Sequence, residues 1–342
     1  MVRFVFTVSV WLVVIAISLV HTSVGAATPA ESLLNQPDSW FAGDEGRKAV
    51  ECILTWQSQH GDWPKNKDTT KKQFDGDSSK LKGTFDNGAT TGELRVLAKA
   101  FRVTGDSRYQ QAFFKGFDHI LRAQYPNGGW PQYFPLSDKY HRHITFNDGS
   151  MIRILEFLRD TSASTDFALL DENRHALAHH AFDRGVDCIV KCQVVIDGAP
   201  TVWCAQHDEV TLAPADARSY ELASLSGAES AGIVRFLMTL DNPSPDVVRA
   251  VKGAVAWFES SRIDGYRYNR SSNETNLIKD PNARPLWARF YELKSNRPFF
   301  CDRDGVVKYD IQEIGAERRG GYTWYGNWGQ TVLNEYAKWL KR

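Results

Sequence analysis

The sequence of 342 residues lacks net charge, since 41 Lys and Arg residues balance 41 Asp and Glu residues. A neutral chain exerts no overall electrostatic attraction on nucleic acid, so we expect no nucleic-acid partner. The chain also lacks a G-x-S-x-G motif, because "SLSGAES" does not fit that spacing, which argues against the common serine hydrolase elbow. Strand signals are few.

Long apolar runs are absent except at the N-terminus. Residues 1–27 carry one cation, Arg3, then an apolar run from Phe4 to Val20 and the small residues "SVGAA". This order is typical of a secretory signal peptide, and an uncleaved membrane anchor is the alternative. We therefore predict a signal peptide at 1–27 and a mature domain at 28–342. We expect that domain to be secreted or periplasmic, monomeric and free of the membrane after cleavage.

Cysteines are few, and no C-x-x-C pair is present, which argues against a zinc site. An odd number of cysteines leaves at least one thiol unpaired in an exported chain. Two of them lie four residues apart in a predicted helix, where a disulfide is difficult to form. We predict that the cysteines are mostly buried small apolar residues. They are Cys52, Cys188, Cys192, Cys204 and Cys301.

A repeat organises what is present. The stretches "ILTWQSQHGDWPKN", "ILRAQYPNGGWPQY" and "IVKCQVVIDGAPTVW" align at Gln57, Gln124 and Gln193, with spacings of 67 and 69 residues. A degenerate fourth copy, "AVAWFESSRIDGYRY", places Phe258 another 65 residues on. Each copy is an apolar helix end, a turn with glycine and an aromatic residue.

A second predicted helix precedes each later copy, at 90–104, 150–160 and 226–240. The repeating unit is therefore a helix pair of about 65 residues, which predicts an all-α-dominated fold, either a closed α/α toroid or a short solenoid. Three full units favour the toroid. The polar stretches 62–83 and 262–285 are predicted loops, and the second carries N-x-S/T sequons at Asn269 and Asn273.

Two similar segments, "TFDNG" at 84–88 and "TFNDG" at 145–149, precede predicted helices. Helix capping is one explanation for Asp86 and Asp148, since a capping carboxylate contributes about 1 kcal/mol. For Asp86 it is the weaker one, because Thr90 and Glu93 form a capping box nearer the helix.

Equivalent corners of a toroid face the same end of its central groove. The two segments would then bring together Asp86, Asn87, Asn147 and Asp148. Carboxylate and amide oxygens are ligands that suit Ca²⁺. The pair of segments therefore favours a calcium site.

In these and other motifs the chain resembles the pectate lyases of polysaccharide lyase family ten. The resemblance covers most of the chain from about residue 45 to the end, and it rests on several motifs in order. They are "FDNGATTGELRVLAKAF", "LRAQYPNGGWPQYFPL", "HITFNDGSMIRILEFL", "VWCAQHD", "RSYELASLSGAESAGIVRFL", "ARFYEL", "NRPFFCDRDG" and "RRGGYTWYGNWG". The chain departs from the family pattern at Ala223, near which the resemblance implies a bulky residue or proline, and this departure touches no implied catalytic position.

The resemblance implies an α/α toroid with a smaller irregular lobe, and a groove between them that binds polygalacturonate. It implies calcium-assisted β-elimination that yields 4,5-unsaturated oligogalacturonides. Asp86 and Asp148 would serve the metal, and Asp86 and Asn87 the substrate. Arg218 would be the Brønsted base, while Arg289 and Arg303 would bind uronate carboxylates through bidentate pairs.

An arginine base strains the rule that arginine keeps its proton. From the residues alone, four rival bases stay open: His141, His143, His207 and Lys139. The ordinary alternative for each arginine is a surface salt bridge that contributes little. Four tryptophans are candidates for stacking on sugar rings, although the first two lie in the repeat turn and can simply pack there: Trp63, Trp130, Trp324 and Trp328.

Three other functions compete. An inverting glycoside hydrolase on an α/α toroid would use Asp86 or Asp148 as acid and base. A terpene-cyclase-like toroid requires an aspartate-rich protonating motif, and the chain has none. A noncatalytic pectin-binding protein would keep the C-terminal arginine cluster and bind the polymer without turnover. The cluster is Arg284, Arg289, Arg297, Arg303, Arg318 and Arg319.

Overall fold

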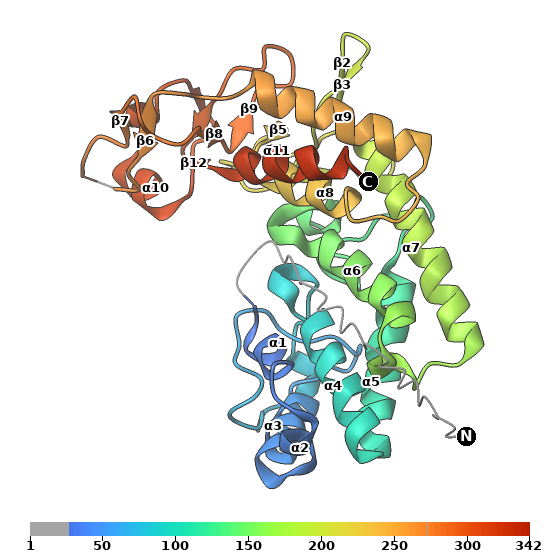
Figure 1. The fold of residues 1–342 in the computed structure, drawn as a ribbon. Coiled ribbons are helices and arrows are strands. Elements are labelled where there is room, and N and C mark those ends of the chain that lie inside the picture. Colours follow the sequence, from blue (N-terminus) through green and yellow to red (C-terminus); the bar gives the residue numbers. More distant parts are fainter. Residues whose placement is uncertain (1–26, 272) are drawn as a thin grey trace, which may run out of the picture.

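The computed structural model describes residues 27–271 and 273–342. Residues 1–26 of the predicted signal peptide lie outside the described residues. Helix pairs follow one another in a curved array, from the blue N-terminal helices to the C-terminal helices, as the short α/α toroid predicted from the repeat (Figure 1). Among the described residues, no helix is both long enough and apolar enough to cross a membrane.

Helices dominate the described chain. The α-helices are α1 (Pro29–Leu33), α2 (Asp38–Ala42), α3 (Asp44–Thr55), α4 (Thr91–Thr104), α5 (Ser107–Ala123), α6 (Ser150–Ala163), α7 (Glu172–Cys192), α8 (Glu229–Leu237), α9 (Pro245–Ser260), α10 (Ala316–Gly321) and α11 (Trp328–Trp339). The 3₁₀ turns are η1 (Ser78–Lys80), η2 (Asp86–Gly88), η3 (Tyr140–Arg142), η4 (Asn147–Gly149), η5 (Thr165–Phe167) and η6 (Ile311–Glu313).

The strands are two or three residues long and pair only in twos, all antiparallel. The pairs are β1 (Ile144–Thr145) with β4 (Gln206–His207), β2 (Val195–Ile196) with β3 (Ala199–Pro200), β5 (Leu225–Ser226) with β9 (Phe290–Tyr291), β6 (Tyr266–Tyr268) with β7 (Leu277–Lys279), β8 (Trp287–Ala288) with β12 (Tyr325–Gly326), and β10 (Phe300–Cys301) with β11 (Val307–Lys308). Most belong to the smaller C-terminal lobe, orange and red in Figure 1.

Local signals explain the α4–α5 pair. The predicted capping box begins α4, with the Glu93 carboxylate accepting from the Thr90 backbone N–H at 2.9 Å. Gly105 ends the helix in the left-handed conformation, at φ 69°, where glycine carries no steric penalty. In α5, apolar residues at helical spacing, Phe113, Phe117 and Ile120 among them, face the core.

The repeated glutamine joins one helix pair to the next. The side-chain amide of Gln57 donates to the carbonyls of Gly61 in its own turn and Ala112 in α5, at 3.0 and 2.8 Å. Gln124 donates in the same way to Gly128 and Ala181, at 2.9 and 2.8 Å. The third copy, Gln193, bridges Thr201 and Ala250. This recurring bridge confirms the repeat.

A repeated tryptophan closes the end of each unit from inside. The indole N–H donates to a carbonyl near the end of the unit's helix, at 2.7 to 2.9 Å. The pairs are Trp63 to Ile53, Trp130 to Ile120, Trp203 to Ile189, and Trp287 to Phe258. The carbonyls are 67, 69 and 69 residues apart. Phe258 is therefore equivalent to the isoleucines and not to the glutamines, so our predicted register for the fourth copy was wrong by four residues.

Two further predictions have different outcomes. The stretch 262–285 is not only loop, because β6 and β7 form a hairpin in which Arg267 pairs with Ile278. The alternation of the hairpin is masked in the sequence by the polar turn between its strands. All five cysteines are free and buried, as expected.

We expect replacement of Gln124 by Ala to lower the free energy of unfolding by about 1–3 kcal/mol, because two carbonyls lose their donor. Urea unfolding measures the change. Gln59→Ala is the matched control, since Gln59 is exposed and its amide contacts only the adjacent His60 ring. Equal midpoints for the two variants would contradict the structural role of the repeated glutamine.

Candidate active site

Three corners of the toroid have the same backbone frame. In each, one residue donates its N–H to a repeat tryptophan's carbonyl, and the next donates to a carbonyl of the following unit. The first set is Thr84 to Trp63, Thr145 to Trp130 and Ser226 to Trp203, at 2.8–3.1 Å; the second is Phe85 to Gln132, Phe146 to Ala205 and Gly227 to Arg289, at 2.9–3.1 Å. The residues that follow are therefore held at equivalent places.

These equivalent places carry different residues. The first position after the frame is Asp86, Asn147 or Ala228, and the second is Asn87, Asp148 or Glu229. The segments TFDNG and TFNDG do form equivalent corners, with Asn87 and Asp148 both left-handed at φ 55° and 51°. Asp86, however, is the first residue after the frame and Asp148 the second, so the two carboxylates are not at equivalent positions. The third corner, with Glu229, was missed because "SLSGAES" shares no letters with the other two at these positions.

Asp86 is buried and makes polar contacts with two side chains far along the chain. One carboxylate oxygen, Oδ2, pairs with the Lys65 ammonium and accepts from the Gln132 amide at 2.6 Å. The other, Oδ1, is buried and has no hydrogen-bond partner among the described residues. Burial lowers the pKa of Lys65, but the hydrogen bond and charge of Asp86 outweigh it and raise that pKa. Asp86 caps no helix, since its side chain accepts from no helix N–H.

Asp148 differs from its neighbours because solvent reaches it. Its Oδ2 accepts from the Asn147 amide at 2.8 Å, and among the described residues no basic side chain forms an ion pair with it. The surrounding protein nevertheless removes part of the water around the carboxylate. This desolvation, followed by the negative charges of Glu229 and Asp86, raises the pKa of Asp148. The N-cap of α6 is Gly149, so the capping explanation fails here too.

Glu229 lies at the N-terminus of α8 and is buried. Its Oε1 accepts from Arg289 Nη2 at 2.7 Å, and its Oε2 accepts from the Ser226 hydroxyl. Burial lowers the pKa of Arg289, but the charges of Glu229, Tyr322, Asp148 and Glu221 together outweigh it and raise that pKa. Of the three acidic corners, two therefore contain a resident cation, Lys65 or Arg289, and the accessible Asp148 between them does not.

This charge pattern fits a divalent cation beside Asp148. The free Oδ1 of Asp86, the Asp148 carboxylate and the Asn87 amide are oxygen donors of the kind that Ca²⁺ takes. Two cavities meet at Asp148. One, of about 430 Å³, is lined by Lys65, Asn87 and Asp148 among others. The second, of about 220 Å³, is lined by Asp148, Glu229, Arg289 and Trp328 among others.

A pair of tyrosines gathers arginines beside the second cavity. The Tyr220 and Tyr322 rings meet edge to face with centroids 5.5 Å apart. Arg218 and Arg303 lie 5.0 and 5.8 Å from the Tyr220 centroid, and Arg289 lies 4.9 Å from that of Tyr322. The structure thus brings the three predicted arginines to one aromatic platform. It adds a fourth, Arg318, which is 4.5 Å from the Tyr220 centroid.

Two other arginines of the C-terminal cluster have partners away from this platform. Arg297 lies 3.6 Å from the Tyr309 ring centroid, and Arg319 donates to the Ile314 carbonyl at 2.8 Å. Arg303, which belongs to the platform, is exposed and also pairs with Glu317 at 3.1 Å. Density of arginine in the sequence does not therefore identify the members of the site.

Arg218 forms a bidentate pair with Glu221 through Nε and Nη2, with the first bond at 2.6 Å. Glu221 is buried and also accepts from the Tyr322 hydroxyl at 2.6 Å. Burial lowers the pKa of Arg218, but the hydrogen bonds and charge of Glu221 raise it more. Arg218 keeps its proton in this arrangement. Its side chain is 43% exposed, which leaves it room to leave Glu221.

Two rival bases have other surroundings. His207 is fully buried: its Nε2 accepts from the Cys204 N–H at 3.1 Å, its Nδ1 donates to the Leu212 carbonyl at 2.8 Å, and burial lowers its pKa to about 4. It is a structural residue. His141 stacks on Tyr140 with centroids 4.0 Å apart, and burial followed by nearby lysines lowers its pKa.

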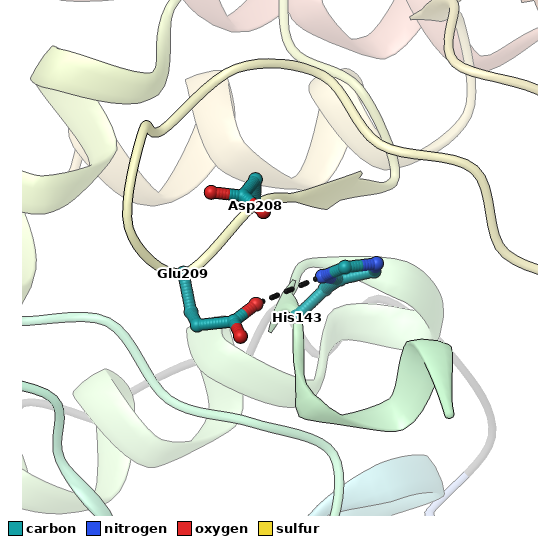
Figure 2. Close-up of side chains that lie close together, drawn as sticks. All are labelled: His143, Asp208 and Glu209. Carbon is teal, nitrogen blue, oxygen red and sulfur yellow. Dashed lines mark hydrogen bonds and ion pairs between the residues drawn. The ribbon is translucent and has the colours of Figure 1, made fainter. Parts of the chain in front are cut away.

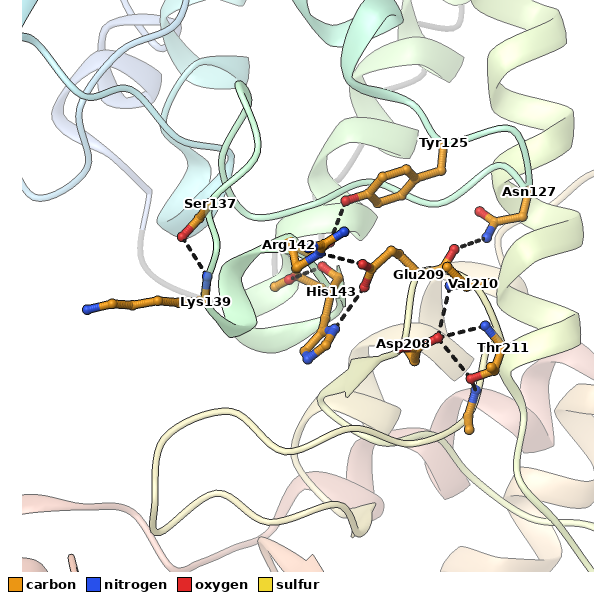
Figure 3. Close-up of polar contacts among 12 residues, drawn as sticks. Tyr125, Asn127, Ser137, Lys139, Arg142, His143, Asp208, Glu209, Val210 and Thr211 are labelled. Carbon is orange, nitrogen blue, oxygen red and sulfur yellow. Dashed lines mark hydrogen bonds and ion pairs between the residues drawn. The ribbon is translucent and has the colours of Figure 1, made fainter.

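His143 belongs to a separate cluster with Asp208 and Glu209, whose ligand atoms lie within 4.8 Å of one another. Figure 2 shows His143 Nδ1 bonded to Glu209, at 2.9 Å, with Asp208 beside them. Arg142 pairs with the other Glu209 oxygen, and one Asp208 oxygen accepts from the Thr211 N–H at 2.7 Å (Figure 3). An imidazole and an already neutralised carboxylate suit Ca²⁺ poorly, so the cluster fits a clamp between strands β1 and β4 better. The fourth rival, Lys139, is exposed and points away from it (Figure 3).

Three of the four candidate tryptophans do not face a groove. Trp63, Trp130 and Trp324 are fully buried. The packing alternative is therefore confirmed for Trp63 and Trp130, and stacking on sugar was the wrong interpretation for Trp324. Their indole N–H groups all bond to backbone carbonyls. Trp328 is half-buried and lines the second cavity.

Comparisons with known proteins identify the family of this chain. The family model for pectic acid lyase matches residues 57–333. A solved family 10 polysaccharide lyase from Cellvibrio cellulosa is 36% identical, with a TM-score of 0.79, over 88% of this chain and 96% of that one. An aspartate-to-alanine mutant of a family 10 polysaccharide lyase from the same organism, in complex with trigalacturonic acid, is 35% identical, with a TM-score of 0.79, over 92% and 99%. No curated protein sequence is a significant match.

The fold, together with the family model and the structural matches, defines a polysaccharide lyase on an α/α toroid. The chain belongs to the pectic acid lyase family, in agreement with the resemblance seen in its motifs.

We expect Asp148→Asn to raise the free energy of unfolding slightly at pH 7 without calcium. A carboxyl whose pKa is raised by folding loses stability as pH rises through its unfolded value toward its folded one, and Asn removes that loss. Solvent screening keeps the effect small. Urea unfolding at pH 4 and 7 measures it, with exposed Asp75→Asn as control. A variant that is less stable at pH 7 would indicate a structural role.

Proposed function

We propose that this chain is an exported, monomeric pectate lyase that cleaves α-1,4-polygalacturonate by calcium-assisted β-elimination and releases 4,5-unsaturated oligogalacturonides. The observation that carries the proposal is the accessible Asp148, which forms no ion pair among the described residues and lines the same cavity as Arg289 of the arginine platform. The trigalacturonic acid complex of the related lyase supports a polygalacturonate substrate.

The proposed reaction removes the C5 proton of a uronate, which lies α to a carboxylate and is therefore very weakly acidic. The electrons of the C5–H bond form the C4=C5 double bond, the C4–O bond breaks, and the departing oxygen acquires a proton. Positive groups at the carboxylate stabilise the developing charge. A base must also reach C5–H within hydrogen-bond distance.

Asp86 and Asp148 would hold calcium, with Asn87 beside them as a substrate contact. When bound, the ion supplies positive charge that stabilises the uronate carboxylate and the enolate-like anion formed from it. Arg289 would bind the same carboxylate, since it is nearly buried and lines the cavity that includes Asp148. Arg303 is exposed and would bind a neighbouring uronate.

Arg218 is the proposed base, and Glu221 sets the condition for it. The bidentate pair keeps Arg218 protonated, so the pair must open before the guanidine accepts the C5 proton. Positive charge from bound calcium, Arg289 and Arg303 would favour the neutral form. His141 is the rival that stays closest to the site, because the charges of Lys65 and Asp86 both act on its pKa.

The first test is a lyase assay on polygalacturonate, read as the ultraviolet absorbance of the conjugated double bond. We expect activity to disappear in excess chelator and to return with Ca²⁺. Highly methyl-esterified pectin should be a poor substrate, because esters remove the charge that the cation and arginines bind. Reducing ends without absorbance would indicate the glycoside hydrolase alternative, and binding without turnover the noncatalytic one.

The same assay, applied to variants of the two aspartates, tests the metal role. Asp86→Asn and Asp148→Asn should lose at least about 100-fold in rate while the fold survives, because both lose a ligand charge. Calorimetric titration with Ca²⁺ should show weakened binding in both. Near-normal turnover of the two variants would refute the metal role.

A third prediction concerns the base. Arg218→Ala should abolish turnover yet still bind trigalacturonate, because binding rests on Arg289 and Arg303. The rate of the unmutated enzyme should rise into the alkaline range, where Arg218 loses its proton more readily.

Glu221→Gln provides the matched test of this assignment. Removing the carboxylate that raises the pKa of Arg218 should move the pH–rate profile to lower pH. The outcome that contradicts Arg218 is a substantial rate in Arg218→Ala together with an inactive His141→Ala variant. The pH optimum should then lie near neutral.

A further inference from the structure

The Glu229–Arg289 pair is joined through both the main chain and the side chains. The Arg289 carbonyl accepts from the Gly227 N–H at 2.9 Å, and the Arg289 N–H donates to the Trp324 carbonyl at 2.7 Å. The corner that carries Glu229 therefore also fixes the backbone of Arg289. The side-chain contact at 2.7 Å adds a second point of attachment, 60 residues away in the sequence.

Glu229 is itself held in place. Its Oε2 accepts from the Ser226 hydroxyl, while its own N–H donates to the Ser226 Oγ at 3.3 Å. The side chain is only 4% exposed and starts helix α8, whose N-terminus favours a negative charge. It therefore has little freedom to move away from Arg289.

Only one of the three guanidinium nitrogens of Arg289 has a hydrogen-bond acceptor in the described part of the protein. Nη2 bonds to Glu229, and the Tyr322 and Trp328 ring centroids lie 4.9 and 5.9 Å away. Among the described residues, neither Nε nor Nη1 of Arg289 has a hydrogen-bond acceptor. Arg289 and Asp148 line the same cavity.

The pair also has an electrostatic cost at the site. The charge of Glu229 raises the pKa of Asp148, and so opposes the ionised form that would bind a cation. A buried ion pair contributes little net stability compared with apolar residues of similar size. Stability alone therefore gives a weak reason for a carboxylate at this corner.

We infer that Glu229 is a positioning residue for Arg289: by holding Nη2, it directs the remaining guanidinium donors toward the uronate carboxylate at the reacting sugar. This inference rests on the proposed function and adds a residue to it. Glu229 does not touch substrate, and acts only through Arg289. Asn87 and Asp148, at the equivalent corners, contact ligands directly in the proposed function.

A double-mutant cycle with Glu229→Gln and Arg289→Ala tests the inference. In the unmutated background, Glu229→Gln should lower kcat/KM for polygalacturonate about 10-fold or more. In the Arg289→Ala background, it should lower kcat/KM less than about twofold. Calcium affinity, measured by calorimetry, should be unchanged or higher in Glu229→Gln, because a charge that opposes ionised Asp148 is gone. Additive losses in the two backgrounds would overturn the inference.

Controls separate this role from stability and from the proposed function. Glu335→Gln removes the carboxylate that pairs with Arg235 of the same helix α8, at 3.0 Å, and should leave kcat/KM unchanged. If Glu229→Gln fails to fold, Ser226→Ala frees Glu229 instead and should show the same dependence on Arg289. No unsaturated product from the unmutated enzyme would refute the proposed function. The same cycle, read as trigalacturonate affinity, would still decide whether Glu229 orients Arg289.

Discussion

The balance of charge at three corners of the toroid determines the character of the cleft. Asp86 and Glu229 are buried, and each has a resident cation, Lys65 or Arg289. The negative charges of both act on Asp148, which is accessible and has no such partner among the described residues. Two compensated acids and one uncompensated acid leave a net negative charge, where the proposed cation would bind most favourably. The proposed anionic substrate would then be bound by the arginines of the platform.

Repeated polar bonds make this arrangement possible. Glutamine amides and tryptophan indoles bond to backbone carbonyls at successive helix ends, so that every unit presents its corner in the same frame. The frame uses main-chain atoms, and the side chains at the corners are therefore free to diverge. One corner carries an acid and an amide, the next an amide and an acid, and the third an alanine and a glutamate.

Arginine chemistry in the cleft depends on aromatic and acidic neighbours together. Tyr220 and Tyr322 gather the guanidinium groups, and Glu221 links this platform to Arg218. The Arg218–Glu221 pair holds Arg218 in its protonated form. Arg289, by contrast, is fixed by Glu229 and retains open donors. The acidic partners thus differ in effect. The proposed base, Arg218, is exposed enough to leave Glu221, whereas Arg289, the proposed carboxylate-binding residue, is held by the buried Glu229.

The sequence by itself determined the helix pairs, the capping box before α4, the burial of the cysteines and the two acidic corners, because periodicity, capping and repetition are local properties of the chain. Only the tertiary structure decided the register of the fourth repeat, the β6–β7 hairpin, the burial of Trp324 and the partners of the acids. Lys65 meets Asp86 across 21 residues, and Glu229 meets Arg289 across 60. Such pairs depend on how distant helices and turns pack, and no local pattern specifies that packing.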